Sequence, residues 1–363
     1  MLRLLVKLLV GWSRYPTDPQ LGHGAAWNPS GLANHVKAAR ASVPDTPFYL
    51  TEYNVGCCIG YTGHDTSASA AFAFRTIPAL DGVVDILSWW TFTDVFEEGG
   101  LPTKEYSNIY GLMTYHGVPK PGWRGFELLN GAGDHRVPAT LPSDMDTLYD
   151  SQSQRVVSGD CVTDDQTNMA GFTLSSVKAD TPAYCCAKCQ AVGQQECSFW
   201  TFYNGTCEFK SSDAGRTTAP GYVSGSRVVP GNSSSSMGSP LSVFATINGT
   251  EPGVASLQVF LSLWANPSDP SAVKNRTVKV TVKHAAGAAP KAVVGWRIDE
   301  SHGNSLAAWE AMGSPAVPSS AQLSLLIKAS QIVPEPLTHT SNGESTVVEV
   351  PMTGDSAVRL NFS

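Results

Sequence analysis

The sequence predicts a multidomain protein in which an α/β part is followed by a cysteine-rich module and an antiparallel β domain. Strand-like and helix-like segments alternate up to about residue 133, which is typical of βα units. Six of the eight cysteines lie between residues 161 and 207, and after residue 240 apolar and polar residues alternate with the period of a strand. A chain of 363 residues has room for two or three domains, since domains usually contain about 100–200 residues.

Two strand-plus-helix units are expected in the α/β part. Parallel strands need cover on both faces, so these units are not expected to stand alone. A further strand is expected in "LLVKLLVGW", residues 4–12. The predicted elements that follow it are a helix at 29–43, a strand at 47–52, a helix at 66–79, a strand at 83–92 and a helix at 122–131.

The cysteine-rich module is expected over residues 149–228. Cys185 and Cys189 are four residues apart, so both fall on one face of a short helix, while "CSFWTFY" and "GTCEFK" are typical of paired strands. Clustered cysteines indicate disulfides made in an oxidising compartment. Zinc is the alternative, because Cys186 and Cys189 have ligand spacing, but no second such pair is present and no metal is expected.

The antiparallel β domain is expected over residues 240–363, after a polar linker at 229–239 that contains "NSSSSMGS". Its clearest strands are "LSVFATI", "LQVFLSLWA" and "RTVKVTVKH", which Gly, Pro and Asn turns separate. One helical insertion is expected at 305–329.

Composition and charge restrict the partners and the compartment. The net charge is −7, and no Lys/Arg-rich run could follow a phosphate backbone, so nucleic acid is not expected. No window reaches the roughly 20 apolar residues of a membrane span. The apolar start "MLRLLVKLLVGWS" contains Arg3 and Lys7 and is not a convincing signal peptide. Secretion is nevertheless expected from the cysteines and from five glycosylation sequons, at Asn204, Asn232, Asn248, Asn275 and Asn361.

Glu52 ends a strand-like, apolar segment in "PFYLTEYNVGCC". The carboxyl ends of parallel strands are where α/β barrels place their chemistry, so Glu52 is a candidate catalytic carboxylate. An N-cap or a surface salt bridge is the alternative. The next strand ends in "SWWTFTDVFEEGG", where indoles beside carboxylates suit a sugar, although a core tryptophan pair followed by a solvated acidic turn has the same sequence pattern.

An ordered series of motifs resembles the family 39 glycoside hydrolases, which include β-xylosidases and α-L-iduronidase. The series is "YPTDP", "TEYN", "HDTSASAAF", "SWWTFTDVFEE", "GVPKPGW" and "WRIDESHGNSLAAWEAMGSP". The resemblance implies a (β/α)8 TIM barrel followed by a β-sandwich, and the forms "TEYN" and "FEE" are closer to the β-xylosidase branch. It implies a retaining hydrolase of O-glycosyl compounds, with an oligo- or polysaccharide of xyloside type as substrate and no cofactor.

The same resemblance assigns roles to individual residues. Glu52 would be the nucleophile that forms a covalent glycosyl-enzyme, and a second carboxylic acid about 5–5.5 Å away would act as acid/base. Glu97 and Glu98 would bind sugar hydroxyls, Trp90 would form a wall of that subsite, and Tyr15 would approach from the loop after the sixth strand.

Two departures from the family pattern concern the start of the chain. The acid/base belongs to an Asn-Glu motif, and no Asn-Glu pair occurs in the 363 residues. Ser13 and Arg14 precede Tyr15 where the family has a histidine. We therefore expect residues 1–133 to be the C-terminal part of a barrel in a truncated chain, because two or three strands cannot close a barrel of eight. Such a chain is expected to fold poorly over this part and to have little or no glycosidase activity.

The cysteine-rich module resembles a PAN/apple domain. This resemblance suggests the pairs Cys185–Cys207 and Cys189–Cys197, and a glycan or a protein as ligand; a disulfide-stabilised spacer without a ligand is the alternative. The module would be inserted in a sandwich whose first strand lies at 134–148. Cys57 and Cys58 would bridge to each other or to the missing part of the barrel. The alternative function for the whole chain is a non-catalytic carbohydrate- or protein-binding adhesion protein that uses the apple domain.

Overall fold

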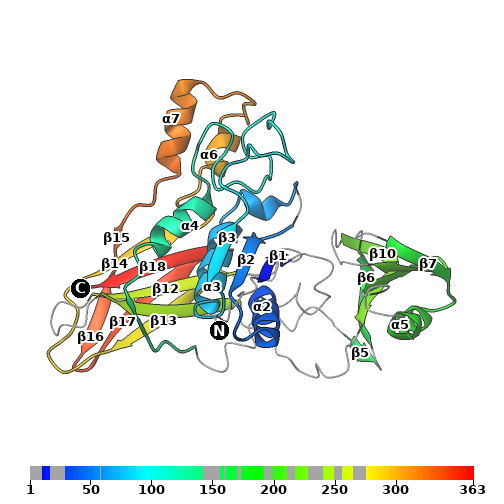
Figure 1. The fold of residues 1–363 in the computed structure, drawn as a ribbon, viewed down its shortest axis with the longest axis horizontal. Coiled ribbons are helices and arrows are strands. Elements are labelled where there is room, and N and C mark those ends of the chain that lie inside the picture. Colours follow the sequence, from blue (N-terminus) through cyan, green and yellow to red (C-terminus); the bar gives the residue numbers. More distant parts are fainter. Residues whose placement is uncertain are drawn as a thin grey trace, which may run out of the picture.

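The computed structural model describes most of the chain in well-defined stretches. The described residues are 10–16, 29–57, 59–141, 156–158, 161–169, 173–191, 197, 199–210, 217–227, 240–248, 256–264 and 275–363. Figure 1 shows the fold as a ribbon.

The α/β part contains a three-stranded parallel sheet in the order β1-β2-β3, formed by Val10–Arg14, Phe48–Tyr53 and Ile86–Trp89. Helices α2, Gly31–Ser42, and α3, Ala68–Ala79, follow β1 and β2, with the short 3-10 helix η2, Thr62–His64, before α3. Helix α4, Pro121–Leu129, begins with proline at its first position, where the missing N–H costs nothing. These three helices lie close to the ranges predicted at 29–43, 66–79 and 122–131.

Strand β3 is shorter than the predicted strand at 83–92. After Trp89 the backbone leaves the parallel sheet and bonds to a later loop: the Leu112 N–H donates to the Thr91 carbonyl and the Asp94 N–H to the Met113 carbonyl. The apolar run continues into this turn as far as the exposed Phe92, and periodicity alone does not distinguish this course from a longer strand.

The C-terminal part consists of two antiparallel sheets with a common core. One has the order β15-β14-β18-β12-β11-β4 and the other β13-β17-β16. Apolar side chains of both sheets form one cluster, which includes Leu261, Val350 and Leu360. The strands are β4 His135–Val137, β11 Leu241–Ile247, β12 Leu257–Leu263, β13 Arg276–Lys283, β14 Val293–Ile298, β15 Glu335–Pro336, β16 His339–Asn342, β17 Ser345–Met352 and β18 Ser356–Phe362.

The predicted helical insertion corresponds to two helices, α6 at Leu306–Ala311 and α7 at Ser320–Ala329. Ser319 caps α7 by accepting a bond from the backbone N–H of Gln322, whose side chain accepts from the Ser319 N–H in return. The insertion contacts the α/β part, since Trp309 and Leu326 share a buried cluster with Tyr106 and Val118.

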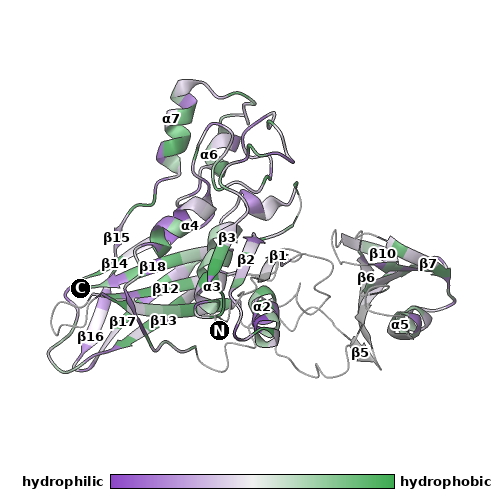
Figure 2. Cartoon of the chain, viewed as in Figure 1, coloured by the Kyte–Doolittle hydropathy of each residue, from purple (hydrophilic) through white to green (hydrophobic). Residues whose placement is uncertain are grey.

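Helices α3 and α4 pack on the six-stranded sheet, and this contact joins the α/β part to the C-terminal part. Phe74 of α3 and Leu128 of α4 lie in one cluster with Phe260 and Ile298 of the sheet. Figure 2 shows α3, β12 and β18 as predominantly hydrophobic where they meet. The two helices also pack closely on each other, since a Cβ on Gly125 of α4 would lie 3.1 Å from the Cα of Ala70 of α3.

The cysteine-rich module is a six-stranded sheet in the order β5-β6-β10-β8-β9-β7, with helix α5 at Pro182–Ala191 on one face. Disulfides join Cys185 to Cys207 and Cys189 to Cys197, the two pairs that the apple resemblance suggests. Cys57 and Cys186 are also disulfide-bonded. The strands are β5 Val156–Ser158, β6 Cys161–Asn168, β7 Thr173–Lys178, β8 Phe199–Tyr203, β9 Thr206–Lys210 and β10 Thr217–Arg227.

In the sequence, the cysteine-rich module lies between β4 and β11, two paired strands of the six-stranded sheet in the C-terminal part. Val137 of β4 is opposite Ala245 of β11, and both strands are at one edge of that sheet. The predicted first strand at 134–148 is observed at His135–Val137, and residues 142–148 lie outside the described part. Among the described helices, none is long and apolar enough to cross a membrane.

Candidate active site

Glu52 lies near the carboxyl end of the central strand β2, where its side chain is half-buried. The hydroxyl of Tyr15, which directly follows β1, donates a hydrogen bond to Oε1 of Glu52. Burial and the adjacent Glu52 carboxylate keep the pKa of the Tyr15 phenol well above its ordinary value, and the charge of Glu98 acts in the same direction. Tyr15 therefore stays protonated and orients the carboxylate as a donor.

Aromatic rings connect Tyr15 to the turn after β3. The ring centroid of Tyr15 is 5.9 Å from that of Tyr110, which is 5.8 Å from Phe96, which in turn is 5.9 Å from Trp90. Edge-to-face and tilted contacts of this kind are the favoured geometry of aromatic pairs. The predicted site residues Tyr15 and Trp90 thus belong to one aromatic wall beside Glu52.

The two acidic residues of the turn differ in their relation to the wall. Glu97 and Glu98 are both exposed. Glu98 is close enough to raise the pKa of Tyr15, which places its charge in the same neighbourhood as Glu52. Glu97 is its neighbour in the chain, and its exposed carboxylate is accessible to a ligand.

Asn54 and His64 hold the loops that carry this wall. The side-chain amide of Asn54 donates to the carbonyls of Trp90 and, at 3.0 Å, of Tyr110. The ring of His64 contacts the carbonyl of Gly56 at 2.9 Å through Nε2, and burial lowers its pKa. The asparagine of "TEYN" thus ties the Glu52 strand to both aromatic segments.

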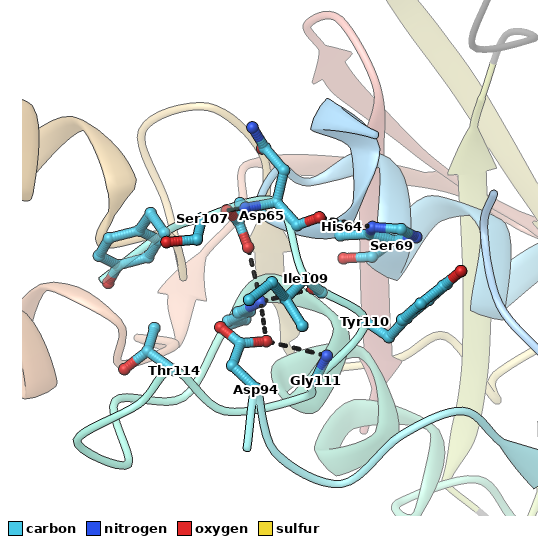
Figure 3. A network of polar contacts seen from close by, with 12 residues as sticks. His64, Asp65, Ser69, Asp94, Ser107, Ile109, Tyr110, Gly111 and Thr114 are labelled. Atoms are coloured by element: carbon cyan, nitrogen blue, oxygen red, sulfur yellow. Dashed lines mark hydrogen bonds and ion pairs between the residues drawn. The ribbon is translucent and has the colours of Figure 1, made fainter. Parts of the chain in front are cut away.

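A buried charge cluster contains Asp65 and Asp94, which Figure 3 shows from close by. Nζ of Lys120 is 2.6 Å from Oδ1 of Asp65 and 2.7 Å from Oδ1 of Asp94, and it also donates to the carbonyl of Ile109 at 2.9 Å. The Lys120 side chain is 0% exposed and each aspartate side chain 1%. The cluster connects three segments that are far apart in the sequence.

Gly111 completes the contact with Asp94. Its backbone N–H donates to Oδ1 of Asp94 at 3.0 Å. A Cβ at this position would lie 2.3 Å from the Asp94 nitrogen, so only glycine permits the loop to approach the turn so closely.

Two carboxylates share one cation in this cluster, and burial together with the Asp65 charge raises the pKa of Asp94. Burial raises that pKa to about 7, although Lys120 acts in the opposite direction. One ammonium can neutralise only one buried carboxylate, so the folded protein holds a proton on Asp94 that the unfolded chain releases near pH 3.8. The stability that this proton contributes is complete below pH 3.8 and is lost as the pH rises to about 7.

We expect Asp94→Asn, which mimics the protonated acid, to remove this pH dependence. Between pH 5 and pH 8 the wild type is expected to lose about 2–3 kcal/mol of stability that the variant retains. Amide hydrogen exchange in α3 and α4 at both pH values measures the difference for this part of the chain. Parallel pH profiles for wild type and variant would contradict the assignment.

The structure places Tyr15 in contact with Glu52 and joins Trp90 to the same aromatic wall, and it adds residues that hold them. Tyr110 lies in a loop without periodicity, so local pattern does not indicate it. Phe96, Lys120 and Asp65 lie within "SWWTFTDVFEE", "GVPKPGW" and "HDTSASAAF", and their place in those motifs is the available signal. The described residues contain no cluster of three or more metal-ligating side chains.

Family models match two consecutive stretches of the chain. Residues 24–157 match the model "Glycosyl hydrolases family 39", which extends past the boundary expected at 133. Residues 161–238 match the model of the PAN domain, which includes most of the expected linker at 229–239.

Two curated β-xylosidases are similar to part of this chain, which agrees with the family 39 match. A β-xylosidase of Geobacillus stearothermophilus is 34% identical over 111 residues, and one of Caldicellulosiruptor saccharolyticus is 36% identical over 107. Each alignment covers 29% of this chain and 22% of the relative, so the match spans about a fifth of each relative's length.

A solved structure shows that the fold extends further than these alignments. The monomeric β-xylosidase of Caulobacter crescentus CB15 superposes with a TM-score of 0.54 at 17% identity, over 98% of this chain and 55% of that one. The enzyme of family 39 from Xanthomonas axonopodis pv. citri gives the same TM-score at 16% identity, with 54% of its chain covered. Residues 24–157 are therefore similar to the glycosyl hydrolases of family 39, and residues 161–238 are similar to the PAN domain.

Proposed function

We propose that this chain supplies the nucleophile of a retaining glycoside hydrolase of β-xylosidase type, with Glu52 as the attacking carboxylate. The observation that carries the proposal is the hydrogen bond from Tyr15 to Glu52 at the carboxyl end of β2, beside the aromatic wall and the charge of Glu98. A carboxylate oriented by a donor suits attack on an anomeric carbon.

The proposed substrate is an oligo- or polysaccharide of xyloside type, and the three parallel strands would be part of a (β/α)8 barrel. Trp90 and the aromatic rings near it would stack on a sugar ring, while Glu97 and Glu98 would accept bonds from its hydroxyls. Glu52 attacks C1, a general acid protonates the leaving oxygen as its bond to C1 breaks, and a covalent ester forms. An acid/base carboxyl then has to activate water, and no Asn-Glu motif in the 363 residues supplies it.

An activated reagent tests the nucleophile separately from the acid. A 2-deoxy-2-fluoro-xyloside with a dinitrophenolate leaving group needs no protonation, because the phenolate departs as a stable anion. We expect this reagent to add a fluoroxylosyl group to the peptide that contains Glu52, as detected by mass spectrometry, while xylobiose is hydrolysed little or not at all.

Two variants serve as controls for the labelling. Glu52→Gln is expected to remain unlabelled, whereas Glu127→Gln, which changes an exposed carboxylate on α4, is expected to be labelled like the wild type. Equal labelling of Glu52→Gln would refute the assignment. No labelling of the folded wild type would favour the alternative, a non-catalytic binding or adhesion protein that uses the PAN domain.

Secretion and N-glycosylation are proposed with this function. The disulfides of the PAN domain are compatible with an extracellular location. Asn204, Asn248 and Asn275 are exposed and can accept glycans, but Asn361 lies in β18 with its Oδ1 buried and is a poor acceptor. The sequon at Asn232 lies outside the described residues.

A further inference from the structure

Strand β13 forms one edge of the smaller sheet in the C-terminal part, whose order is β13-β17-β16 (Figure 1). It pairs with β17 over its whole length, from Arg276 opposite Met352 to Lys283 opposite Ser345. Among the described strands, none pairs with its other edge. An open edge of eight residues is long, because proteins usually keep such edges short or cover them.

The antiparallel register shows which backbone groups face this open edge. The N–H of His284 donates to the Glu344 carbonyl at 2.9 Å and so continues the ladder with β17. Residues of an antiparallel strand alternate between bonding to the partner strand and pointing away from it, so Val282 and Val280 bond to β17. The N–H and C=O groups that point to the open edge are those of Thr277, Lys279, Thr281 and Lys283. We call these four residues the β13 edge.

A cavity of about 1250 Å³ lies between the two sheets and is lined in part by the β13 edge. Its apolar walls come from both sheets and include Val280, Val282, Val243 of β11 and Leu257 of β12. These four side chains are only partly buried, although they pack on the common core. The sheets therefore do not close on each other here, and room remains for further apolar side chains.

The charged side chains around the cavity are all positive. They are Lys279, Lys283 and Lys291, and none of the described residues that line the cavity has an acidic side chain. Glu349 of β17 is opposite Lys279, but Ser345 is opposite Lys283, so Lys283 has no acidic residue across the ladder. Pairing with a second copy of β13 would bring further lysines to this edge, whereas an acidic residue on an incoming strand is favoured.

We propose that the β13 edge binds an extended polypeptide segment in which apolar and acidic residues alternate. The segment adds to the sheet as an antiparallel strand, and its backbone bonds to the four residues of the edge. Its apolar side chains enter the cavity beside Val280 and Val282, and its acidic side chains lie next to Lys279 and Lys283 on the outer face. An acyl chain would use the cavity alone, whereas a polypeptide uses the cavity, the backbone groups and the lysines. The site is independent of Glu52 and of the proposed glycosidase function.

Two synthetic peptides test the proposal with the full chain. In the peptide EVTIEVT, antiparallel pairing places the glutamates opposite Lys283 and Lys279 and the apolar residues opposite the valines of β13. The peptide KVTIKVT has lysines at both positions and is the charge control. We expect fluorescence anisotropy of the labelled peptides to show binding of EVTIEVT that is about tenfold tighter or more. Exchange of the Thr281 and Lys283 amides is expected to slow on binding, because these groups gain partners.

A proline on the edge separates backbone pairing from other kinds of binding. Thr281→Pro removes one N–H of the β13 edge and leaves the bonds to β17 intact, and edge strands tolerate proline at such positions. We expect it to weaken binding of EVTIEVT about tenfold or more. Thr281→Ala keeps the N–H and is the matched control, which is expected to bind like the parent. Lys283→Glu is expected to weaken binding of EVTIEVT and to strengthen binding of KVTIKVT, each about threefold or more.

Equal binding of EVTIEVT by Thr281→Pro and Thr281→Ala, or equal affinity for the two peptides, would overturn the proposal. Binding of EVTIEVT without slower exchange of the Thr281 amide would place the peptide elsewhere and would also refute the site. If the Thr281 and Lys283 amides exchange as slowly as that of Val280 before any peptide is added, the edge is already covered by another segment or a second copy, and the proposal is wrong. The labelling of Glu52 does not involve β13, so each experiment can be interpreted without the other.

Discussion

Replacement of Lys120 by methionine is expected to destabilise the α/β part by about 3–5 kcal/mol, the cost of removing one partner from a buried ion pair. The methionine fills a similar volume, but Asp65 and Asp94 then lack the cation that is 2.6 and 2.7 Å away in the native protein. Hydrogen exchange of the α3 and α4 amides measures the loss where the cluster lies.

Lys37→Met is the control for this prediction, because Lys37 is exposed on α2 and its replacement should change stability by less than about 0.5 kcal/mol. Adding Asp94→Asn to Lys120→Met is expected to recover part of the loss at pH 8, since one unpaired charge is removed. If Lys120→Met is as stable as Lys37→Met, the cluster does not hold the loops together.

Removal of the Cys185–Cys207 disulfide by a double alanine substitution is expected to destabilise the PAN domain by about 3 kcal/mol. The bond closes a loop with a sequence separation of 22 residues, and opening it restores entropy to the unfolded chain. Exchange of the β8 and β9 amides should accelerate accordingly, while that of α3 should not change.

Comparing the exchange rates of β9 and α3 within one molecule makes the prediction for the disulfide specific. The bond joins α5 to β9, whereas Phe74 of α3 packs on the six-stranded sheet of the C-terminal part. Equal acceleration in β9 and α3 would show that the two regions unfold as one unit, and unchanged exchange in β9 would show that the disulfide is not needed.

Regular elements could be predicted from the sequence where local pattern and packing agree. Strand β11 at Leu241–Ile247 coincides with "LSVFATI", because a short, largely apolar run between turn residues indicates both its type and its ends. The spacing of Cys185 and Cys189 predicts helix α5, because residues four apart lie on one helical face.

The site could be predicted only in part, because its supports depend on contacts between distant segments. Glu52 and Trp90 stand at strand ends, where position in a βα unit indicates function. Lys120 is 26 residues from Asp94 in sequence, and nothing in either local pattern shows that they meet. Tyr110 contacts Tyr15 from a loop whose course depends on the buried cluster and on Gly111.

The pairing of β4 with β11 imposes an order on folding. His135 is opposite Ile247, so this short ladder closes only when the ends of a segment of about a hundred residues come together. Closing so long a segment as a random coil is slow and entropically costly. If the cysteine-rich module first folds by itself, through its local hairpin and its disulfides, the effective span becomes shorter, and β4 then joins the sheet edge as a late event.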